Sequence, residues 1–208
     1  MRKDIDQPGR GNPPTKSKTM KIETIEIAGL AGALTALRLP YGKEVRSRMY
    51  TTIKHWQEGI DNPYHVWKNG AEVEINNRDL ALIQTLIKRG DEHAKIVRGI
   101  NVWAKITAPV YFWAEAETYR AGHERLASES TMHIDCKGLS GKELQEAKAA
   151  IPMGKELTKV DMFSYQALRR IVSQRHDHRL PEWHQFIDWV KTLPLAEELI
   201  FAGLNLEE

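Results

Sequence analysis

The chain has 208 residues, of which 41% are hydrophobic and 28% charged, with a formal net charge of +2. This length supports one domain with a packed core, and the small net charge does not indicate a nucleic-acid-binding protein. No apolar run approaches the roughly 18 residues of a membrane-spanning helix, and the N-terminus is too polar for a signal peptide. Cys136 is the single cysteine, which excludes a disulfide framework and favours the cytosol.

Residues 1–19 are rich in Pro, Gly and Lys and contain almost no apolar side chains. Such a segment cannot bury enough surface to offset the entropy lost on ordering. We therefore predict a disordered basic tail over residues 1–19 and a single domain over residues 20–204. A basic arm that binds nucleic acid or a protein partner is the alternative interpretation of the tail.

Apolar periodicity and turn residues divide the rest of the chain into short strands and helices. β-Branched runs and the Asn69-Gly70 hairpin signal predict the strands Lys21–Ala28, Tyr64–Lys68, Ala71–Ile75 and Val102–Ile106. Apolar stripes at helical spacing predict the helices Leu30–Leu39, Asn77–Arg89, Val110–Arg120, Leu139–Ala150, Asp161–Gln174, Glu182–Lys191 and Leu195–Ala202. Ser140 and Glu143 have the spacing of a capping box.

A polar run follows the aromatic-rich helix predicted over Val110–Arg120. Its cations and hydroxyls are Arg120, His123, Arg125, Ser128 and Ser130. A buried strand that leads into a helix, whose end opens into such a cluster, can form a site for an anionic ligand. A core helix followed by a solvated loop is the alternative.

A second polar cluster lies between the last two long helices, where two arginines and two histidines surround Asp177. The forked donors of Arg175 and Arg179 suit a phosphate, and a solvated helix junction is the alternative. His176 and His178 have a spacing that can bind metal, but no third ligand is apparent, so no metal site is predicted. Cys136 has no clear partner base and is expected to be a packing or surface thiol.

In order and spacing, these segments resemble the flavin-dependent thymidylate synthases across roughly residues 21–200. Leu39-Pro40-Tyr41-Gly42 is similar to the family's Cys-Tyr-Gly turn. His93 lies sixteen residues before Pro109, as the histidine of the family's Gly-His-Glu stretch precedes a strand ending in Ala-Pro. The stretch from Ser140-Gly141 to Ile151-Pro152 looks like the family's Ser-Gly to Leu-Pro segment. Arg175 follows Pro152 by twenty-three residues, the spacing of the family's Arg-x-Asp.

The family's signature block, in which Arg-His-Arg is followed by Ser, Asn-Glu, Ser and Arg-Tyr, is degraded here. An ungapped alignment from Pro109 puts Thr118-Tyr119-Arg120 on Arg-His-Arg and Ser128 on the serine that lies against the uracil ring. A two-residue shift instead puts Arg120 on the first arginine and Ser130 on the second serine. The flavin-contacting His and the Asn-Glu pair are missing in both registers, and Lys148 replaces an arginine.

The resemblance implies an α/β (α+β) fold, a small twisted sheet flanked by helices, in a homotetramer with shared sites. Tyr111, Phe112 and Trp113 are expected to form an exposed face that supports this assembly. The resemblance also implies methyl transfer from methylenetetrahydrofolate to deoxyuridylate, with a hydride from FAD and with NADPH as the reductant of the flavin.

On the matched positions, the resemblance implies three sets of site residues. Catalytic roles fall on Ser128 and Ser130. Substrate contacts fall on Arg120, Lys148, Arg175 and Asp177. Flavin contacts fall on His93, with Ser164 and His178 as replacements for lost groups. Because the anion-binding set survives better than the flavin-binding set, nucleotide binding is the stronger implication.

Three other functions stay open. One is a diverged pyrimidine-nucleotide modifying enzyme that uses another donor. Another is a nucleotide-binding or assembly protein that kept this fold and lost catalysis. The third is nucleic-acid binding through the basic tail, which the small net charge does not favour.

Overall fold

The computed structural model describes residues 19–43, 48–51, 71–74 and 77–206. Its centre is a four-stranded antiparallel sheet in the order β1-β4-β6-β5. The strands are β1 (Lys21–Ala28), β4 (Asn101–Pro109), β5 (His123–Ser128) and β6 (Glu156–Ser164). β4 and β6 pair along their whole lengths, so they form the middle of the sheet.

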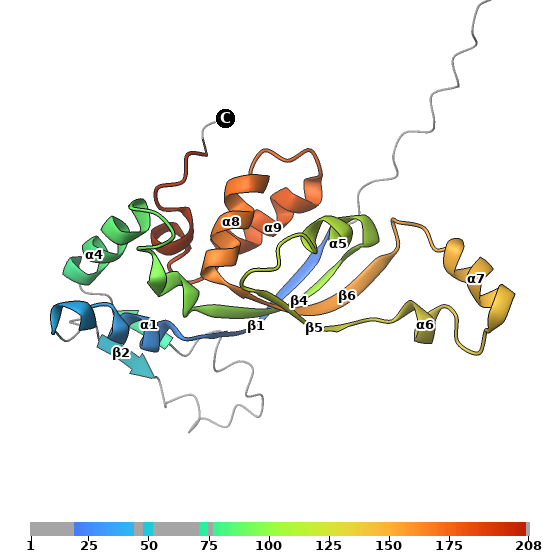
Figure 1. The fold of residues 1–208 in the computed structure, drawn as a ribbon, viewed down its shortest axis with the longest axis horizontal. Helices are drawn as coiled ribbons and strands as arrows, with labels where there is room; N and C mark the ends of the chain where they lie inside the picture. The colour runs from blue at the N-terminus through green and yellow to red at the C-terminus, as the bar shows by residue number, and fades with distance from the viewer. Residues whose placement is uncertain (1–18, 44–47, 52–70, 75–76, 207–208) are drawn as a thin grey trace, which may run out of the picture.

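Three helices cover one face of this sheet: α5 (Val110–Ala116), α8 (Tyr165–Arg175) and α9 (Pro181–Lys191) (Figure 1). Strand residues alternate between the two faces, and in β4 the side chains of Val102, Ala104 and Ile106 are fully buried. No described helix covers the opposite face, where Trp103 and Met162 are only half-buried. The core therefore lies on one side of the sheet.

Aromatic rings fill the space between the sheet and these helices. Phe112 of α5 lies 4.6 Å from Trp183 of α9, measured between ring centroids. Phe186 is 5.1 Å from Trp189 and 5.6 Å from Phe163 of β6. Tilted and edge-on contacts of this kind stabilise aromatic pairs more than the burial of their apolar area alone would. Here they join the helical layer, through α5 and α9, to the sheet.

A second group of elements packs at one end of the sheet: α1 (Leu30–Ala36), η1 (Leu39–Tyr41), α4 (Asn77–Lys88), η2 (Lys95–Arg98) and the π-helix η3 (Glu197–Phe201). Arg169 of α8 holds η3 in place by hydrogen bonds. Its buried guanidinium donates from Nη1 to the carbonyls of Ile200 and Ala202, at 2.8 and 2.6 Å. Burial lowers the pKa of Arg169, and Asp91 opposes that effect.

A short ladder of β2 (Arg48–Thr51) and β3 (Ala71–Glu74) forms a separate two-stranded sheet.

Residues 129–155, between β5 and β6, form an arm that extends away from the sheet (Figure 1). It contains α6 (Thr131–Ile134) and α7 (Gly141–Ala149), and no residue of either helix is buried. Cys136, between them, is buried, which agrees with the expected packing thiol. Several apolar side chains of the arm are exposed: Met132, Ile134, Leu139 and Met153.

The structure confirms the predicted mixed fold and corrects several elements. The predicted helix Asp161–Gln174 is wrong at its start, because residues 161–164 end strand β6. Lys159 and Asp161 point into the core although they are charged, so the sequence of that strand does not alternate between apolar and polar residues. Strand β5 was not predicted. It is an edge strand with one buried residue, so its sequence shows no alternation of apolar and polar residues.

Local details also differ from prediction. The prediction of an exposed aromatic face is wrong, since Phe112 and Trp113 are buried. Ser140 occupies the N-cap of α7, but its side chain makes no capping hydrogen bond. Residues 71–74 form a strand as predicted, with Arg48–Thr51 as partner, whereas Tyr64–Lys68 and Asn69-Gly70 lie outside the described residues. So does the tail predicted over residues 1–19, except for Thr19.

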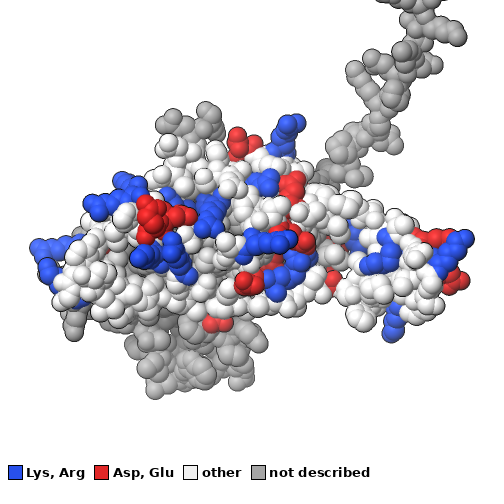
Figure 2. All heavy atoms as spheres, in the orientation of Figure 1, with Lys and Arg blue, Asp and Glu red and all other residues white. Residues whose placement is uncertain are grey.

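Basic and acidic side chains are interspersed on the face shown in Figure 2, without a broad area of one sign. This distribution gives no support to nucleic-acid binding by that face. Among the described residues, no helix combines the length and the apolar character needed to cross a membrane.

Candidate functional site

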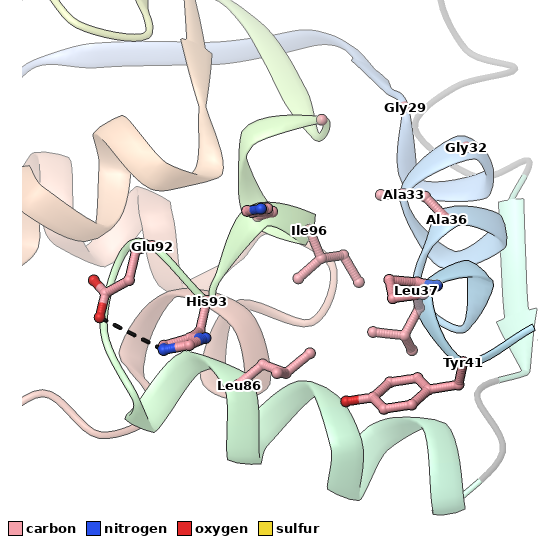
Figure 3. Close-up of a pocket in the computed structure, with 13 residues that line it drawn as sticks. Gly29, Gly32, Ala33, Ala36, Leu37, Tyr41, Leu86, Glu92, His93 and Ile96 are labelled. Carbon is pink, nitrogen blue, oxygen red and sulfur yellow. Dashed lines mark ion pairs between the residues drawn. The ribbon is translucent and has the colours of Figure 1, made fainter.

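One pocket of the described chain opens between α1 and α4, and we call it the α1–α4 pocket. Its volume is about 610 Å³, and its walls come from α1, η1, the end of α4 and η2. Leu37, Leu86 and Ile96 point into the space, with His93 and Tyr41 on opposite sides of it (Figure 3). A mostly apolar pocket of this size with a few polar groups at its rim suits a flat organic ligand.

Small residues allow the two sides of this pocket to approach. Gly29 has a φ of +90°, and a Cβ there would lie 1.8 Å from the carbonyl oxygen of Gly99. Because only glycine fits both the backbone angle and the close approach, α1 can start directly against η2. The Cβ atom of Ala33 then packs near Gly99, which leaves the glycine-lined wall flat.

His93 reaches the pocket from the loop between α4 and η2. Gly90, with a φ of +109°, ends α4, and His93 follows through a turn closed by its N–H to the Gly90 carbonyl. Nε2 of His93 lies 3.7 Å from Oε1 of Glu92, and the His93 side chain is 48% exposed. The ring is therefore accessible to a ligand.

A second, more polar pocket lies between the end of α5 and α8, and we call it the α5–α8 pocket. It has a volume of about 430 Å³, and its lining includes Tyr119, Arg120, Arg170 and Gln174. Arg170 is 3.4 Å from Asp91. The exposed Arg120 guanidinium makes no hydrogen bond or ion pair within the described residues. Its forked donors are available to an anion.

Arg175 lies beside this pocket but already has partners. Its Nη1 is 3.0 Å from Oε2 of Glu115, and its Nε donates to the Tyr119 hydroxyl at 2.7 Å. The same Glu115 oxygen accepts from Trp183 Nε1 at 2.9 Å. His178 Nε2 lies 3.4 Å from it. The Arg175 guanidinium also stacks 4.8 Å above the Trp183 ring, so the cluster is satisfied internally.

A buried charged network lies beneath the α5–α8 pocket, on β5 and β6. Nε2 of His123 is 2.9 Å from Oδ2 of Asp161. Next to them, Glu117 receives Arg125 Nη2 at 2.9 Å and Lys159 Nζ at 3.2 Å. Burial and Arg125 lower the pKa of Lys159, against the effects of Glu117 and Asp161. For Glu117 burial raises the pKa, but Lys159 and Arg125 outweigh it, and the net shift is downward.

No group of three His, Cys, Asp or Glu side chains is placed to hold a metal ion within residues 19–43, 48–51, 71–74 and 77–206. The His176–His178 pair therefore gains no third ligand there. His178 instead accepts the Leu180 N–H at Nδ1, at 3.2 Å. This bond fixes its proton on Nε2, toward Glu115.

Solved structures with the same architecture identify the fold. Thymidylate synthase X from Helicobacter pylori, in its complex with FAD and dUMP, superposes with a TM-score of 0.58 and 11% identity. The match covers 89% of this chain and 99% of that one. The fold is that of the flavin-dependent thymidylate synthases. The UMP/dUMP methylase PolB from Streptomyces cacaoi, bound with 5-Br UMP, matches with a TM-score of 0.54, 11% identity and coverages of 89% and 95%.

No protein-family model and no curated protein sequence matches this chain. The shared fold is thus visible in the arrangement of the elements and no longer in overall sequence similarity.

Five of the predicted site residues lie in three separate places within one chain. His93 lies at the α1–α4 pocket, and Arg120 lies at the α5–α8 pocket. The third place is the arm and its base, where Ser128 ends β5, Ser130 precedes α6, and Lys148 Nζ donates to the Thr131 hydroxyl. The ion pair between Arg170 and Asp91 links the lining of the α5–α8 pocket to the loop that carries His93.

Two predicted contacts are occupied or displaced. Ser164 caps α8, because its buried hydroxyl accepts the Ala167 N–H at 3.1 Å, so its oxygen serves the helix. Asp177 is exposed and does not orient Arg175, whose partners are Tyr119 and Glu115. Sequence reasoning assigned no role to Glu115, since nothing in its local pattern distinguishes it from a solvated helix residue.

Proposed function

We propose that this protein is an enzyme that binds a uridine nucleotide and methylates its base with the help of FAD. The observation that carries this proposal is the match over 99% of thymidylate synthase X, whose structure holds FAD and dUMP. A second supporting observation is the fold shared with PolB, a UMP/dUMP methylase. The two neighbours have different nucleotides, so either dUMP or UMP is a candidate substrate.

The α1–α4 pocket is the proposed place for the flavin ring system. Its apolar walls exclude water, its glycine-lined side accepts a flat ring, and His93 supplies a hydrogen-bonding group at the rim. When bound, FAD would supply the hydride that completes a methyl group. His178 and Ser164 are weaker candidates for flavin contacts, because Glu115 and the α8 N-terminus engage them.

The α5–α8 pocket is the proposed place for the nucleotide phosphate. Arg120 offers a guanidinium that has no partner among the described residues, Arg170 adds a second cation, and Gln174 adds an amide. Charge-assisted hydrogen bonds from arginine to phosphate are among the strongest in proteins. Lys148, Ser128 and Ser130 would contact the nucleotide from another direction, with the serines beside the base.

We further propose a homotetramer in which the arm of one copy completes the site of another. Its helices α6 and α7 bury none of their residues in this chain, and it exposes Met132, Ile134 and Leu139. The uncovered sheet face, with Trp103 half-buried, offers a second surface. Association would bring the arm residues to the pockets that lie apart from them within one chain.

The donor of the methyl group in this proposal is methylenetetrahydrofolate, and NADPH reduces the flavin. An enzyme with the same nucleotide and another donor is the second candidate, which the missing signature residues favour. A protein that only binds nucleotide is the third. Formation of thymidylate from dUMP, methylenetetrahydrofolate, NADPH and FAD distinguishes the first from the other two.

Flavin binding tests the proposal and its location together. We expect FAD fluorescence to be quenched on titration with the protein, and His93→Ala to weaken that binding by about tenfold, the loss of one hydrogen bond of about 1.4 kcal/mol. His184→Ala, which changes an exposed histidine of α9 outside both pockets and outside the arm, is the matched control and should bind like wild type. Equal FAD affinity of wild type and His93→Ala would remove the flavin from this pocket.

A further inference from the structure

His123 and Asp161 form a buried pair between the start of β5 and the end of β6. Their side chains are 5% and 0% exposed. The imidazole is held on three sides: Nε2 lies 2.9 Å from Asp161 Oδ2, Nδ1 lies 2.8 Å from the Tyr119 carbonyl, and the ring stacks on Phe163 with centroids 4.3 Å apart. The ring therefore has one fixed position.

The two acceptors around the ring determine how many protons the pair holds. A carbonyl oxygen can only accept, so Nδ1 carries a proton toward Tyr119. The contact between Nε2 and Oδ2 needs a second proton, which resides on either the imidazole or the carboxyl. In both arrangements the pair holds two protons and has no net charge. Loss of one proton would leave two lone pairs facing each other and a buried negative charge.

The surrounding charges do not take over the role of His123. Oδ1 of Asp161 is buried without a hydrogen bond, and Arg125 Nε approaches it only to 3.9 Å. Arg125 and Lys159 are both engaged by Glu117 of the turn after α5. The His123 proton is thus the closest compensation for the Asp161 carboxylate, and nothing else described on β5, β6 or α5 donates to it.

The same ring is linked to the wall of the α5–α8 pocket. It binds the carbonyl of Tyr119, whose hydroxyl accepts from Arg175. The turn that follows is closed by Gly122, whose carbonyl accepts the Ser164 N–H at 2.7 Å. Tyr119, Arg120 and Ala121 of this turn line the pocket. The His123 ring therefore ties the segment that carries Arg120 to the rigid strand β6.

We propose that the His123–Asp161 pair is a positioning element of the nucleotide site, which holds the turn at residues 119–122, and with it Arg120, through the two protons that it shares. This role rests on the proposed binding of a nucleotide phosphate in the α5–α8 pocket. Loss of the two hydrogen bonds of the His123 ring releases the turn and weakens nucleotide binding.

Asp161→Asn separates positioning from simple packing. A carboxamide can donate to Nε2 while Nδ1 keeps its proton, so both hydrogen bonds persist with no proton to lose. The measurement is the calorimetric Kd of dUMP at about pH 7 for wild type, Asp161→Asn and His123→Phe, which keeps a ring against Phe163 and removes both hydrogen bonds. We expect the His123→Phe Kd to be about tenfold or more above the wild-type value, and the Asp161→Asn Kd to change less than about threefold.

The outcomes distinguish this inference from the proposed function. A wild-type Kd in His123→Phe overturns the positioning role alone. No dUMP binding by wild type overturns the proposed function, and the positioning role with it.

If Asp161→Asn fails to fold, a measurement on the wild-type protein without ligand still tests the proposal. In the NMR spectrum of wild type, we expect the Nδ1 proton of His123 to exchange slowly with solvent, because it is buried against the Tyr119 carbonyl. Rapid exchange of that proton contradicts the proposal.

Discussion

The guanidinium of Arg175 is held by the carboxylate of Glu115, with Nη1 3.0 Å from Oε2. Trp183 lies beneath the guanidinium and donates to the same carboxylate. The arginine that sequence spacing assigned to a ligand phosphate is therefore already part of the packing between α5, α8 and α9. Glu115 and Tyr119 already engage Nη1 and Nε of this guanidinium.

We expect Arg175→Ala to lower the free energy of unfolding by about 1–3 kcal/mol, because it leaves the half-buried Glu115 carboxylate without its main cation. Arg175→Lys should restore only part of this loss, since a point charge cannot bind Glu115 and Tyr119 together. Urea denaturation measures both. Arg89→Ala, at an exposed arginine, is the control. Unchanged stability together with lost dUMP binding would show that Arg175 serves the ligand.

Arg120→Ala should behave in the opposite way. Because Arg120 is exposed and unpartnered within the described residues, its loss should leave stability within about 0.5 kcal/mol of wild type. Its loss should weaken dUMP binding by roughly ten- to a hundredfold, the contribution of one charge-assisted phosphate contact. Calorimetric titration, with Arg89→Ala as the control, measures the affinity. Wild-type affinity in Arg120→Ala would place the phosphate elsewhere.

Ser164 and Gly122 should show non-additive effects on stability. Ser164→Ala removes the α8 cap and should cost about 1 kcal/mol. Gly122→Ala should cost more, because Gly122 has a φ of +76° and the new Cβ would lie 2.3 Å from the Ser164 hydroxyl oxygen. The double variant removes that clash, so its cost should be less than the sum of the two. A strictly additive cycle of denaturation free energies would contradict the geometry.

Glu117 should support stability at neutral pH and lose that effect in acid. Its pKa is lowered in the folded state, since Lys159 and Arg125 outweigh burial. Its stabilising effect is therefore present above the unfolded pKa and disappears as the pH falls through the folded one. We expect Glu117→Gln to have a lower Tm than wild type at about pH 7, and the same Tm as wild type at about pH 3. The exposed Glu124→Gln is the control, and an equal Tm difference at both pH values would contradict this role.

The sequence predicted the elements whose apolar pattern is strong. Helix α9 begins at Pro181, one residue before the prediction, and β1 has the predicted limits, because β-branched runs and prolines act locally. β5 was not predicted, because its residues face solvent and are held by pairing with β6. Strand β6 was missed because Lys159 and Asp161, although charged, point into the core.

The candidate site was only partly predictable for a related reason. His93, which the resemblance assigned to the flavin, lines the α1–α4 pocket, and its role there stays a prediction. Spacing could not reveal that Glu115 faces Arg175, or that Ser164 caps α8, because both contacts depend on tertiary packing. The network around His123 arises from three separate elements and has no local sequence signature.

The most direct test of the proposed function is a calorimetric titration of dUMP, and separately of UMP, into the FAD-saturated protein, with the flavin absorbance spectrum recorded in parallel. We predict saturable binding of at least one of the two nucleotides in the micromolar range, with a change in the flavin spectrum as the base approaches the ring. Binding of neither nucleotide, with a flavin spectrum identical to that of free FAD, would contradict the assignment of this protein as a flavin-dependent uridine-nucleotide enzyme.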